Sequence, residues 1–340
     1  MFEKYKTGFY IGGVYLAGIM GAGFATGQEL LRYFVRFGIW GLWGIILCGF
    51  LFALVGFKVL YFMHIKGISD YREFLACLMG KKWAKAAEAV SFCFIIALYS
   101  SMLAATGSLA ENWLGISRFW GICAMLMVCS ALVIGGVKSL GTFSVLLCPL
   151  LIGGSIFLGL RLYFGDIQVF APLHRPDDNI LGSVLIYVSY NIISGVSLLC
   201  ALSSQIRNIR DAVLGGALGG LAIGVVGFVL ALPLHRFYEV ISGAELPIFM
   251  LIKESGAILR GGYGILLLSA VLTTAASCCY SAVSLLKTDR MIERVMAVAL
   301  VGGAAFLLSL MGFSHIVGRL YYVFGVIGLA ELAVIVAIKV

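Results

Sequence analysis

Residues 10–34 read YIGGVYLAGIMGAGFATGQELLRYF, an apolar stretch in which glycines and polar residues are concentrated. A membrane-spanning helix needs about 20 apolar residues, so this stretch is long enough to cross a bilayer. Its central glycines are Gly18, Gly21, Gly23 and Gly27. Thr26, Gln28 and Glu29 follow at membrane depth. An unpaired backbone group is costly in lipid, so a helix can be interrupted only beside a cavity or a ligand. We therefore predict a membrane helix that stops and restarts near Gly21, with free N–H groups for an anion and free C=O groups for a cation.

Close helix packing is the alternative explanation of these glycines. The spacings Ala17-xxx-Gly21 and Gly23-xxx-Gly27 are typical of small-residue faces on which two membrane helices pack. Packing alone does not explain the polar residues that follow directly, so we favour the broken helix. The candidate substrate-binding residues of this segment are Gly21, Ala22, Gly23 and Phe24.

The composition of the whole chain agrees with a membrane protein. Hydrophobic residues make up 62% of the 340 residues and charged residues only 12%. An ordinary soluble domain has about twice that share of charge, which excludes a soluble enzyme, a nucleic-acid-binding domain and a disordered tail. Breaks in the apolar pattern predict ten membrane-spanning helices, so the chain is expected to be all-α with the lipid bilayer as its solvent. The predicted spans are 7–36, 38–64, 84–110, 119–137, 142–163, 181–205, 212–233, 262–286, 292–312 and 315–338.

Charge distribution predicts the orientation of these spans. An even number of spans places both termini on one side. With that side in the cytoplasm, most of the 24 Lys and Arg residues fall in cytoplasmic loops, as the positive-inside rule requires. We therefore expect a multi-pass protein of the cytoplasmic (inner) membrane with both termini inside. The net charge of +8 then reflects topology and requires no nucleic-acid partner. Residues 234–261 have amphipathic spacing and predict a surface helix or lid.

A family resemblance rests on the first span. Met20-Gly21-Ala22-Gly23-Phe24 is similar to the M-G-S-G-V segment in the first helix of the amino acid–polyamine–organocation (APC) superfamily. The longer string GAGFATGQELLRYF, followed by Phe37-Gly38 and Gly41, resembles the YkvI-like bacterial membrane proteins. The resemblance implies a LeuT-type fold of two inverted five-helix repeats, here residues 1–163 and 164–340, with helices 1 and 6 discontinuous. Ala22 replaces the hydroxyl-bearing serine, so substrate contacts there would come from the backbone alone.

The inverted repeat requires that span six is also interrupted. Serine, asparagine and glycine lie at mid-depth in ILGSVLIYVSYNIISGVSLLCALSSQ, and they compete for backbone hydrogen bonds. An ordinary polar-lined packing face is the alternative. The candidate substrate-binding residues from this span are Tyr190, Asn191, Ser194 and Gly195. Tyr99 in span three is added because a tyrosine in that helix often contributes to the site in the resembled fold.

Span eight contains a threonine pair, Thr273-Thr274, within LLLSAVLTTAASCCYSAV. In sodium-coupled members of the LeuT-type fold, a similar pair supplies two hydroxyl ligands to Na+, and backbone carbonyls complete the shell. The resemblance therefore implies a Na+ site formed by both threonine hydroxyls and the carbonyls of Ala270, Ala17 and Met20. Such neutral oxygens suit a monovalent hard cation. The alternative is that each hydroxyl simply bonds the carbonyl one turn back, as membrane threonines usually do.

Ionisable residues inside membrane spans are costly and are functional by default. Glu29 follows the predicted break and has Arg32 three residues later, which suggests an ion pair, and burial also favours the protonated form of a carboxyl group. Glu331 in span ten has no basic residue within one turn, so it is a candidate proton site or a partner for an arginine on another helix. We take Gln28, Glu29, Arg32 and Glu331 as gating or proton-transfer candidates.

These features favour a secondary active transporter that moves a small amino acid or organic amine by alternating access with a coupled cation. No G-x-x-x-x-G-K-[ST] motif for nucleotide binding and no catalytic motif occurs, so no enzyme activity is expected. No cofactor is expected beyond the coupling ion, for which Na+ is favoured over H+. The alternatives are a transporter-like membrane sensor, or a proton-coupled transporter that uses Glu331 or Glu29. The sequence does not determine the substrate or the oligomeric state.

Overall fold

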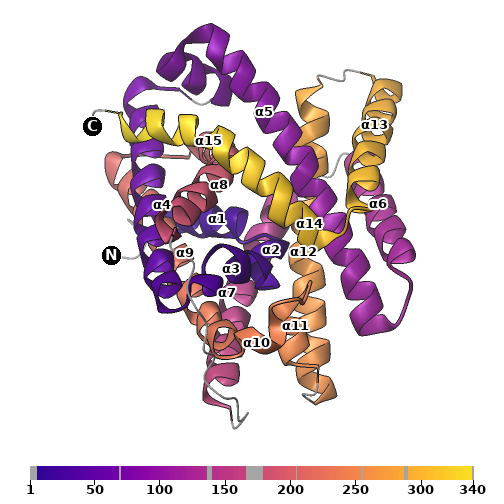
Figure 1. The fold of residues 1–340 in the computed structure, drawn as a ribbon. Helices are drawn as coiled ribbons and strands as arrows, with labels where there is room; N and C mark the ends of the chain where they lie inside the picture. The colour runs from indigo at the N-terminus through magenta and orange to yellow at the C-terminus, as the bar shows by residue number, and fades with distance from the viewer. Residues whose placement is uncertain are drawn as a thin grey trace.

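The computed structural model describes residues 6–338, except for residues 69, 136–139, 166–178, 204, 254–255 and 287–289. Every regular element in these ranges is a helix (Figure 1). Seven helices are long and apolar enough to cross a membrane. Three shorter apolar helices accompany them: Thr7–Ile19, Arg118–Ile134 and Ile152–Phe164. Each predicted span overlaps one of these apolar helices.

The first span is divided into three helices: α1 (Lys6–Ile19), α2 (Ala22–Ala25) and α3 (Gln28–Tyr33). The other long helices are α4 (Ile39–Lys66), α5 (Tyr71–Leu109), α6 (Arg118–Ile134), α7 (Leu140–Phe164), α8 (Ile180–Ser203), α9 (Ile209–Arg236), α12 (Ala257–Leu285), α13 (Met291–Ser309) and α15 (Tyr321–Val336). The short elements are a 3-10 turn (Val35–Phe37), α10 (Tyr238–Ile241), α11 (Pro247–Leu251), α14 (Phe313–His315) and two π-helical turns (Ala110–Leu114 and Ile316–Leu320).

Helices α1, α4, α8 and α9 form one group, on the left of Figure 1. Within it α4 and α9 pack backbone against backbone, because glycines leave no side chain between them. A Cβ at Gly220 of α9 would lie 2.1 Å from the Ala53 nitrogen of α4, and one at Gly216 would lie 2.3 Å from the Gly56 carbonyl carbon. These glycines of α9 therefore form a packing surface for α4.

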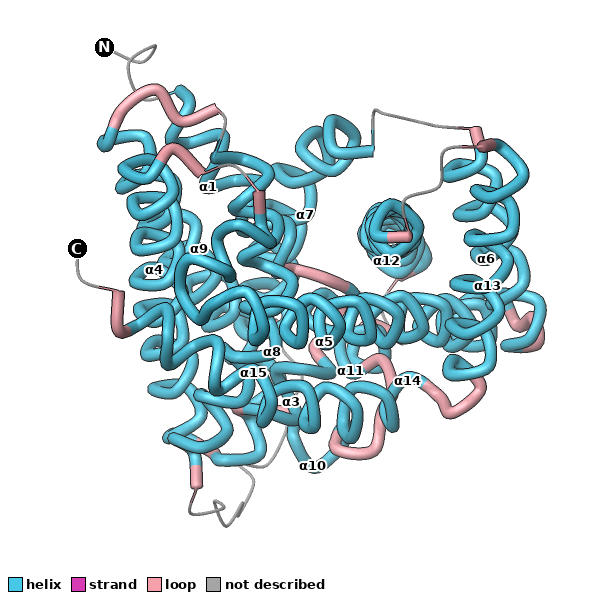
Figure 2. Tube along the Cα trace, turned by 90° about the horizontal axis from the view of Figure 1, so that it is seen from above, coloured by secondary structure: helices cyan, strands magenta, loops and turns pink. Residues whose placement is uncertain are grey.

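Helices α5, α6, α12 and α13 form a second group, and Figure 2 shows α12 end-on beside α6 and α13. Two further helices connect the groups: α7 packs on α9 and α12, and α15 packs on α8 and α5. The broken first span lies between them, since α1 contacts α8 and α9 whereas α2 contacts α5 and α12. The fold thus places the helix break where the two groups meet.

The polar stretch 65–83 is more ordered than the sequence predicts. We expected a connection there, but α5 begins within it at Tyr71, where the Asp70 carboxylate accepts a hydrogen bond from the Glu73 amide (3.0 Å) and caps the helix. Gly80, with φ 81° and ψ 157°, interrupts the helical backbone, so residues 71–79 form a separate helical arm before the span.

The predicted interruption of span six is wrong, because α8 runs continuously from Ile180 to Ser203. Its polar side chains bond within the helix: the Asn191 amide donates to the Tyr187 carbonyl (2.9 Å), and the Ser194 hydroxyl donates to the Asn191 carbonyl (3.2 Å). These groups are satisfied by carbonyls of the preceding turn, so they do not require the helix to open.

Part of the orientation argument rests on residues outside the described ranges. The basic residues concerned are Lys4, Lys138, Arg175, Lys287 and Lys339. The connection 164–180, which separates the two predicted repeats, also lies largely outside the described residues.

Candidate binding site at the broken first helix

The predicted break in the first span is confirmed. Helix α1 ends at Ile19, and the Gly21 amide donates to the Ile19 carbonyl (2.8 Å) instead of reaching Ala17 as it would in an unbroken helix. The backbone of Gly21 is extended, with φ −76° and ψ −171°. The Ala17 carbonyl thereby loses its helical partner, and the first amides of α2 have no carbonyl one turn back.

A second interruption follows at Thr26-Gly27, between α2 and α3. Gly27 has φ 82°, a left-handed conformation that a glycine adopts without steric cost. The Thr26 hydroxyl donates to the Gly23 carbonyl (3.2 Å) and accepts from the Gln28 amide (3.3 Å), so it bonds backbone groups on both sides of the turn. The polar residues of the first span therefore stabilise its irregular backbone.

Three helices meet the first break. A Cβ at Gly21 would lie 3.6 Å from the Met102 methyl group of α5 and 3.8 Å from the Thr274 methyl group of α12. A Cβ at Gly195 of α8 would lie 3.1 Å from Ile19, the last residue of α1. The predicted site residues Gly21 and Thr274 thus lie together at the break with Met102, whereas Gly195 lies against the Ile19 side chain at the end of α1.

Each hydroxyl of the threonine pair on α12 bonds a carbonyl of its own helix, and the Thr273 hydroxyl also lies 3.1 Å from the Ser269 carbonyl. The hydroxyls of Thr273 and Thr274 both donate to the Ala270 carbonyl, at 2.9 and 3.0 Å. This is the bonding within one helix expected of membrane threonines, but it also gathers three neutral oxygens at one place, and each hydroxyl keeps lone pairs for an ion. The released Ala17 carbonyl and the carbonyl of Met20 belong to the break that Thr274 faces.

A buried carboxylate lies against α2. Glu29 is 4% exposed, and a Cβ at Gly23 would lie 2.1 Å from its Oε1 atom. The expected ion pair with Arg32 does not form, because the exposed Arg32 side chain turns away and donates to the Gly318 carbonyl (3.4 Å). The Glu29 side chain therefore folds back toward α2 and makes no ion pair with Arg32.

Tyrosine rings enclose this carboxylate. Tyr187 and Tyr190 of α8 direct their hydroxyls toward Glu29, although neither makes a hydrogen bond of good geometry among the described residues. Their ring centroids lie 5.7 and 5.5 Å from that of Tyr33. The Tyr321 ring of α15 lies 5.0 Å from the Tyr190 ring. Of the candidates on α8, Tyr190 thus reaches the site through its side chain, and Tyr187 is a member that sequence reasoning missed.

Tyr99 does not point at the break. Its buried hydroxyl faces Cys129 of α6 and Cys279 of α12, inside the second helix group. The following residues of α5 take its expected place: Ser101 shares a hydrogen bond of 2.5 Å with the Tyr321 hydroxyl, and Met102 faces Gly21. The sequence alone does not indicate which face of α5 meets the break, because it carries no signal for the contact between Met102 and Gly21.

The remaining candidates lie apart from the break or pack elsewhere. Phe24 directs its ring at α9, where it lies 3.2 Å from the position of a Cβ at Gly227. The Gln28 amide donates to the Ser314 hydroxyl (2.8 Å) and so ties α3 to α14. Glu331 is buried on α15, where it accepts a hydrogen bond from the Tyr71 hydroxyl (3.3 Å).

Residues 237–253, hereafter the lid segment, cover the second interruption. They contain α10 and α11, which matches the expected lid at 234–261 except that α9 continues to Arg236 and α12 starts at Ala257. The Ile248 amide donates to the Thr26 carbonyl (3.1 Å), and the nearby Tyr263 hydroxyl of α12 donates to the Ala25 carbonyl (2.6 Å). Backbone groups released by the break are thus bonded by the lid segment and α12.

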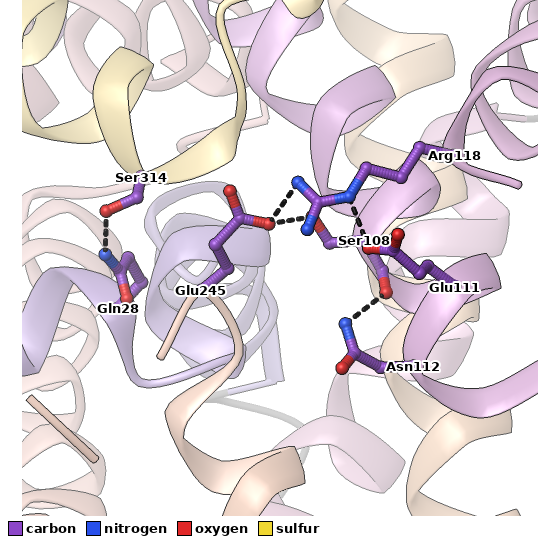
Figure 3. A network of polar contacts seen from close by, with 7 residues as sticks. All are labelled: Gln28, Ser108, Glu111, Asn112, Arg118, Glu245 and Ser314. Atoms are coloured by element: carbon purple, nitrogen blue, oxygen red, sulfur yellow. Dashed lines mark hydrogen bonds and ion pairs between the residues drawn. The ribbon is translucent and has the colours of Figure 1, made fainter. Parts of the chain in front are cut away.

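A polar latch holds the lid segment against α5 and α6 (Figure 3). Glu245 accepts from the Arg118 guanidinium (2.8 Å) and from the Ser108 hydroxyl (2.5 Å). Arg118 also pairs with Glu111, which stands outside the lid segment. Figure 3 shows the Glu245 carboxylate reaching from the lid segment to these groups.

Comparisons with known proteins agree with a membrane transporter fold. No family model matches the chain. It is 24% identical over 330 residues to the uncharacterized membrane protein YkvI of Bacillus subtilis (strain 168), covering 96% of this chain and 94% of that protein. It is 22% identical over 315 residues to the uncharacterized protein YyaD of the same organism, covering 92% and 91%.

Among solved structures, the chain resembles a Na+-coupled sialic acid symporter in a substrate-bound, outward-open state. The TM-score is 0.65 at 14% identity, and the match covers 98% of this chain and 79% of the symporter. The chain is therefore a helical membrane protein that has the fold of a solved symporter and is similar, over nearly its whole length, to two bacterial relatives.

Proposed function

We propose that this protein is a secondary active transporter that moves a small amino acid or organic amine by alternating access, driven by Na+. The observation that carries the proposal is the break between α1 and α2, which faces Thr274 at the boundary between the two helix groups. A broken helix at such a boundary provides polar backbone groups where one group can move against the other. The fold shared with a Na+-coupled symporter supports sodium as the driving ion.

The proposed sodium ligands are the hydroxyls of Thr273 and Thr274 and the carbonyls of Ala270, Ala17 and Met20. The first three oxygens are gathered on α12, and the last two belong to the break. Neutral oxygens bind a monovalent hard cation without the carboxylates that a divalent ion requires. The substrate would lie on the other side of the break, near the amides of Gly21, Ala22 and Gly23.

Helix pairing supports two inverted repeats, residues 1–163 and 164–340. In that arrangement helices at equivalent places in the repeats contact one another, and such contacts occur between α1 and α8, α4 and α9, α5 and α12, and α6 and α13. We further propose that the protein lies in the cytoplasmic (inner) membrane with both termini inside, which places the lid segment on the outer side. This follows from the distribution of Lys and Arg residues.

The sodium site is tested by uptake into proteoliposomes under imposed Na+ and H+ gradients. Replacing Thr273 and Thr274 together by valine keeps the side-chain volume and removes both hydroxyl ligands. We expect uptake to lose its dependence on the Na+ gradient, whereas the double serine variant, which keeps the hydroxyls, retains it. Ser284→Ala is the matched control, because its hydroxyl on the same helix bonds the Tyr280 carbonyl (2.8 Å) one turn back.

Normal sodium-stimulated uptake by the double valine variant would show that the ion site is wrong. Saturable binding of a substrate without its accumulation under either gradient would favour the alternative of a transporter-like membrane sensor. Uptake driven by the H+ gradient alone and lost in Glu331→Gln would favour proton coupling. The buried contact between Tyr71 and Glu331 is the observation behind that second candidate.

A further inference from the structure

The carboxyl group of Glu29 is buried, and the described residues leave it without a counter-ion. Its Oε2 atom is buried and accepts no hydrogen bond within the described ranges. Its basic neighbour on α3, Arg32, is exposed and bonds the Gly318 carbonyl. Burying a carboxylate is costly unless a charge or hydrogen bonds compensate for the lost water. A bound cation would compensate a buried carboxylate at this helix break.

The groups that face Glu29 are suited to a positively charged organic group. Four tyrosines interact electrostatically with it, and they come from three different elements: Tyr33 of α3, Tyr187 and Tyr190 of α8, and Tyr321 of α15. Adjacent rings in this cluster have centroids 5.0 to 5.7 Å apart. Aromatic faces attract cations through their quadrupole, and this attraction strengthens when water is absent.

Two hydroxyls of the same cluster face Glu29 without making a hydrogen bond of good geometry. Those of Tyr187 and Tyr190 are buried without a hydrogen bond among the described residues, whereas Tyr33 donates to the Val317 carbonyl (3.1 Å) and Tyr321 bonds Ser101. A hydroxyl can accept from an N–H donor while it donates to a carboxylate. An ammonium group, which has up to three N–H donors, can satisfy the carboxylate and both hydroxyls at once.

Glu29 also disfavours an anion at the neighbouring amides. Its Oε1 atom lies directly against Gly23, in the middle of the segment whose backbone amides could hold a substrate carboxylate. Like charges this close in a desolvated site repel strongly. The end of the site near Gly23 therefore selects for positive charge.

We propose that Glu29 is the counter-ion of the transported substrate's ammonium group, and that the tyrosine cluster forms the aromatic wall around that group. The inference rests on the proposed transport function and assigns the residues that recognise the positive charge, which amino acids and organic amines share. A metal cation fits less well, because Na+ and Ca2+ prefer shells of several oxygen ligands over aromatic faces.

The proposal is tested by ligand binding to the full-length protein in detergent, which does not require transport. A panel of the twenty standard amino acids, putrescine, tyramine, choline and sialic acid is screened by thermal shift in Na+ buffer. Every primary amine that binds is then compared with its N-acetylated analogue, which keeps the skeleton and loses the positive charge. We expect the wild type to bind the amine at least about thirty-fold more tightly than the analogue, the loss typical of removing one partner of a buried charge pair.

Variants assign the effect to Glu29. Glu29→Gln keeps the side-chain shape and is expected to lower the affinity for the amine by about thirty-fold or more, while Glu29→Asp retains part of it. Glu88→Gln is the control, because that carboxylate pairs with Arg72 on the arm of α5. The comparison of each amine with its analogue uses the wild type alone, so it remains decisive even if a Glu29 variant does not fold.

Several results would overturn the proposal: tight binding of sialic acid or an N-acetylated analogue, no binding by any amine, or full amine affinity in Glu29→Gln. A proton gradient that drives uptake in the wild type but not in Glu29→Gln, at unchanged affinity, would identify a proton site instead. The transport proposal fails separately. Amine binding through Glu29 without accumulation in proteoliposomes would contradict the transport function and support the role of Glu29 as counter-ion. Na+-driven uptake of a compound without an amine would support the transport function and contradict the role of Glu29.

Discussion

Gly23 shows how one residue shapes the site. The carboxylate of Glu29 occupies the space that a side chain at position 23 would need, since a Cβ there would lie 2.1 Å from Oε1 and 2.6 Å from the carboxylate carbon. The backbone at Gly23 is helical, so its conformation alone does not require glycine. The absence of a side chain is what lets Glu29 fold back against α2 toward Tyr187 and Tyr190.

Gly23→Ala should therefore displace the Glu29 side chain and weaken substrate binding. Because the added methyl group overfills a buried site, we also expect a loss of about 1–3 kcal/mol in the free energy of unfolding. Thermal melting in detergent and the affinity of the best-binding amine measure the two effects. Gly303→Ala on α13 is the control, because a Cβ there meets no atom within 4 Å. Unchanged amine affinity in Gly23→Ala would show that amine binding does not depend on the position of the Glu29 side chain against Gly23.

At the level of elements, the lid segment and the first span are joined through the backbone. The amide of Ile248 at the start of α11 completes the hydrogen bonding of Thr26, and Gly27 packs beneath the Ile248 side chain. The opposite side of the lid segment is held by Glu245, which bonds Arg118 and Ser108. The lid segment therefore bridges the second interruption of the first span and the second helix group.

Glu245→Gln should loosen this latch. The ion pair with Arg118 is partly exposed, so its loss is expected to cost only about 1 kcal/mol, equivalent to a few-fold change in the opening equilibrium. Hydrogen exchange measured by mass spectrometry should show faster exchange of residues 244–252. Glu111→Gln removes the other partner of Arg118 but lies outside the lid segment, so exchange there should stay at the wild-type rate. Equal exchange in both variants would mean that Glu245 does not hold the lid segment.

At the level of the whole molecule, two helix groups are joined by α7 and α15. In the first group, glycines of α4 and α9 bring the two backbones into contact, as at Gly220 and Gly216. The second group has side-chain contacts, for example where Gly264 of α12 leaves room for the Trp113 ring, and one close backbone approach, where a Cβ at Gly121 of α6 would lie 3.2 Å from the Gly107 Cα of α5. The break in the first span lies where these groups meet, so a rigid-body shift of one group against the other would change its surroundings.

Gly220→Ala tests the rigidity of the first group. A Cβ at this position would lie 2.1 Å from the Ala53 backbone nitrogen, and backbone atoms cannot move aside as a flexible side chain can. We expect the melting temperature to fall, with a loss of about 1–3 kcal/mol or more in stability. Gly153→Ala on α7 is the control, since a Cβ there has no neighbour within 4 Å. A melting temperature equal to that of the control would contradict direct backbone contact between α4 and α9.

Several features of the site were predictable because they depend on the local chain. Glycines followed by polar residues at membrane depth predicted the break at Gly21, since lipid cannot hydrogen-bond an open backbone. Continuous apolar runs predicted the position of each long helix for the same reason. The continuity of α8 was not predictable in this way. Serine and asparagine can either open a membrane helix or bond to its own carbonyls, and the surrounding contacts decide between these outcomes.

The sequence by itself determined that this is a helical membrane protein with an interrupted first span, because hydropathy and backbone hydrogen bonding are properties of each segment alone. Only the tertiary structure decided which side chains meet at the interruption. It turned Glu29 away from Arg32 toward the tyrosines of α8 and α15, directed Tyr99 into the second helix group, and put Met102 beside Gly21. In a span that is apolar on every face, periodicity does not say which face a neighbour covers, so these contacts arise only when the helices pack.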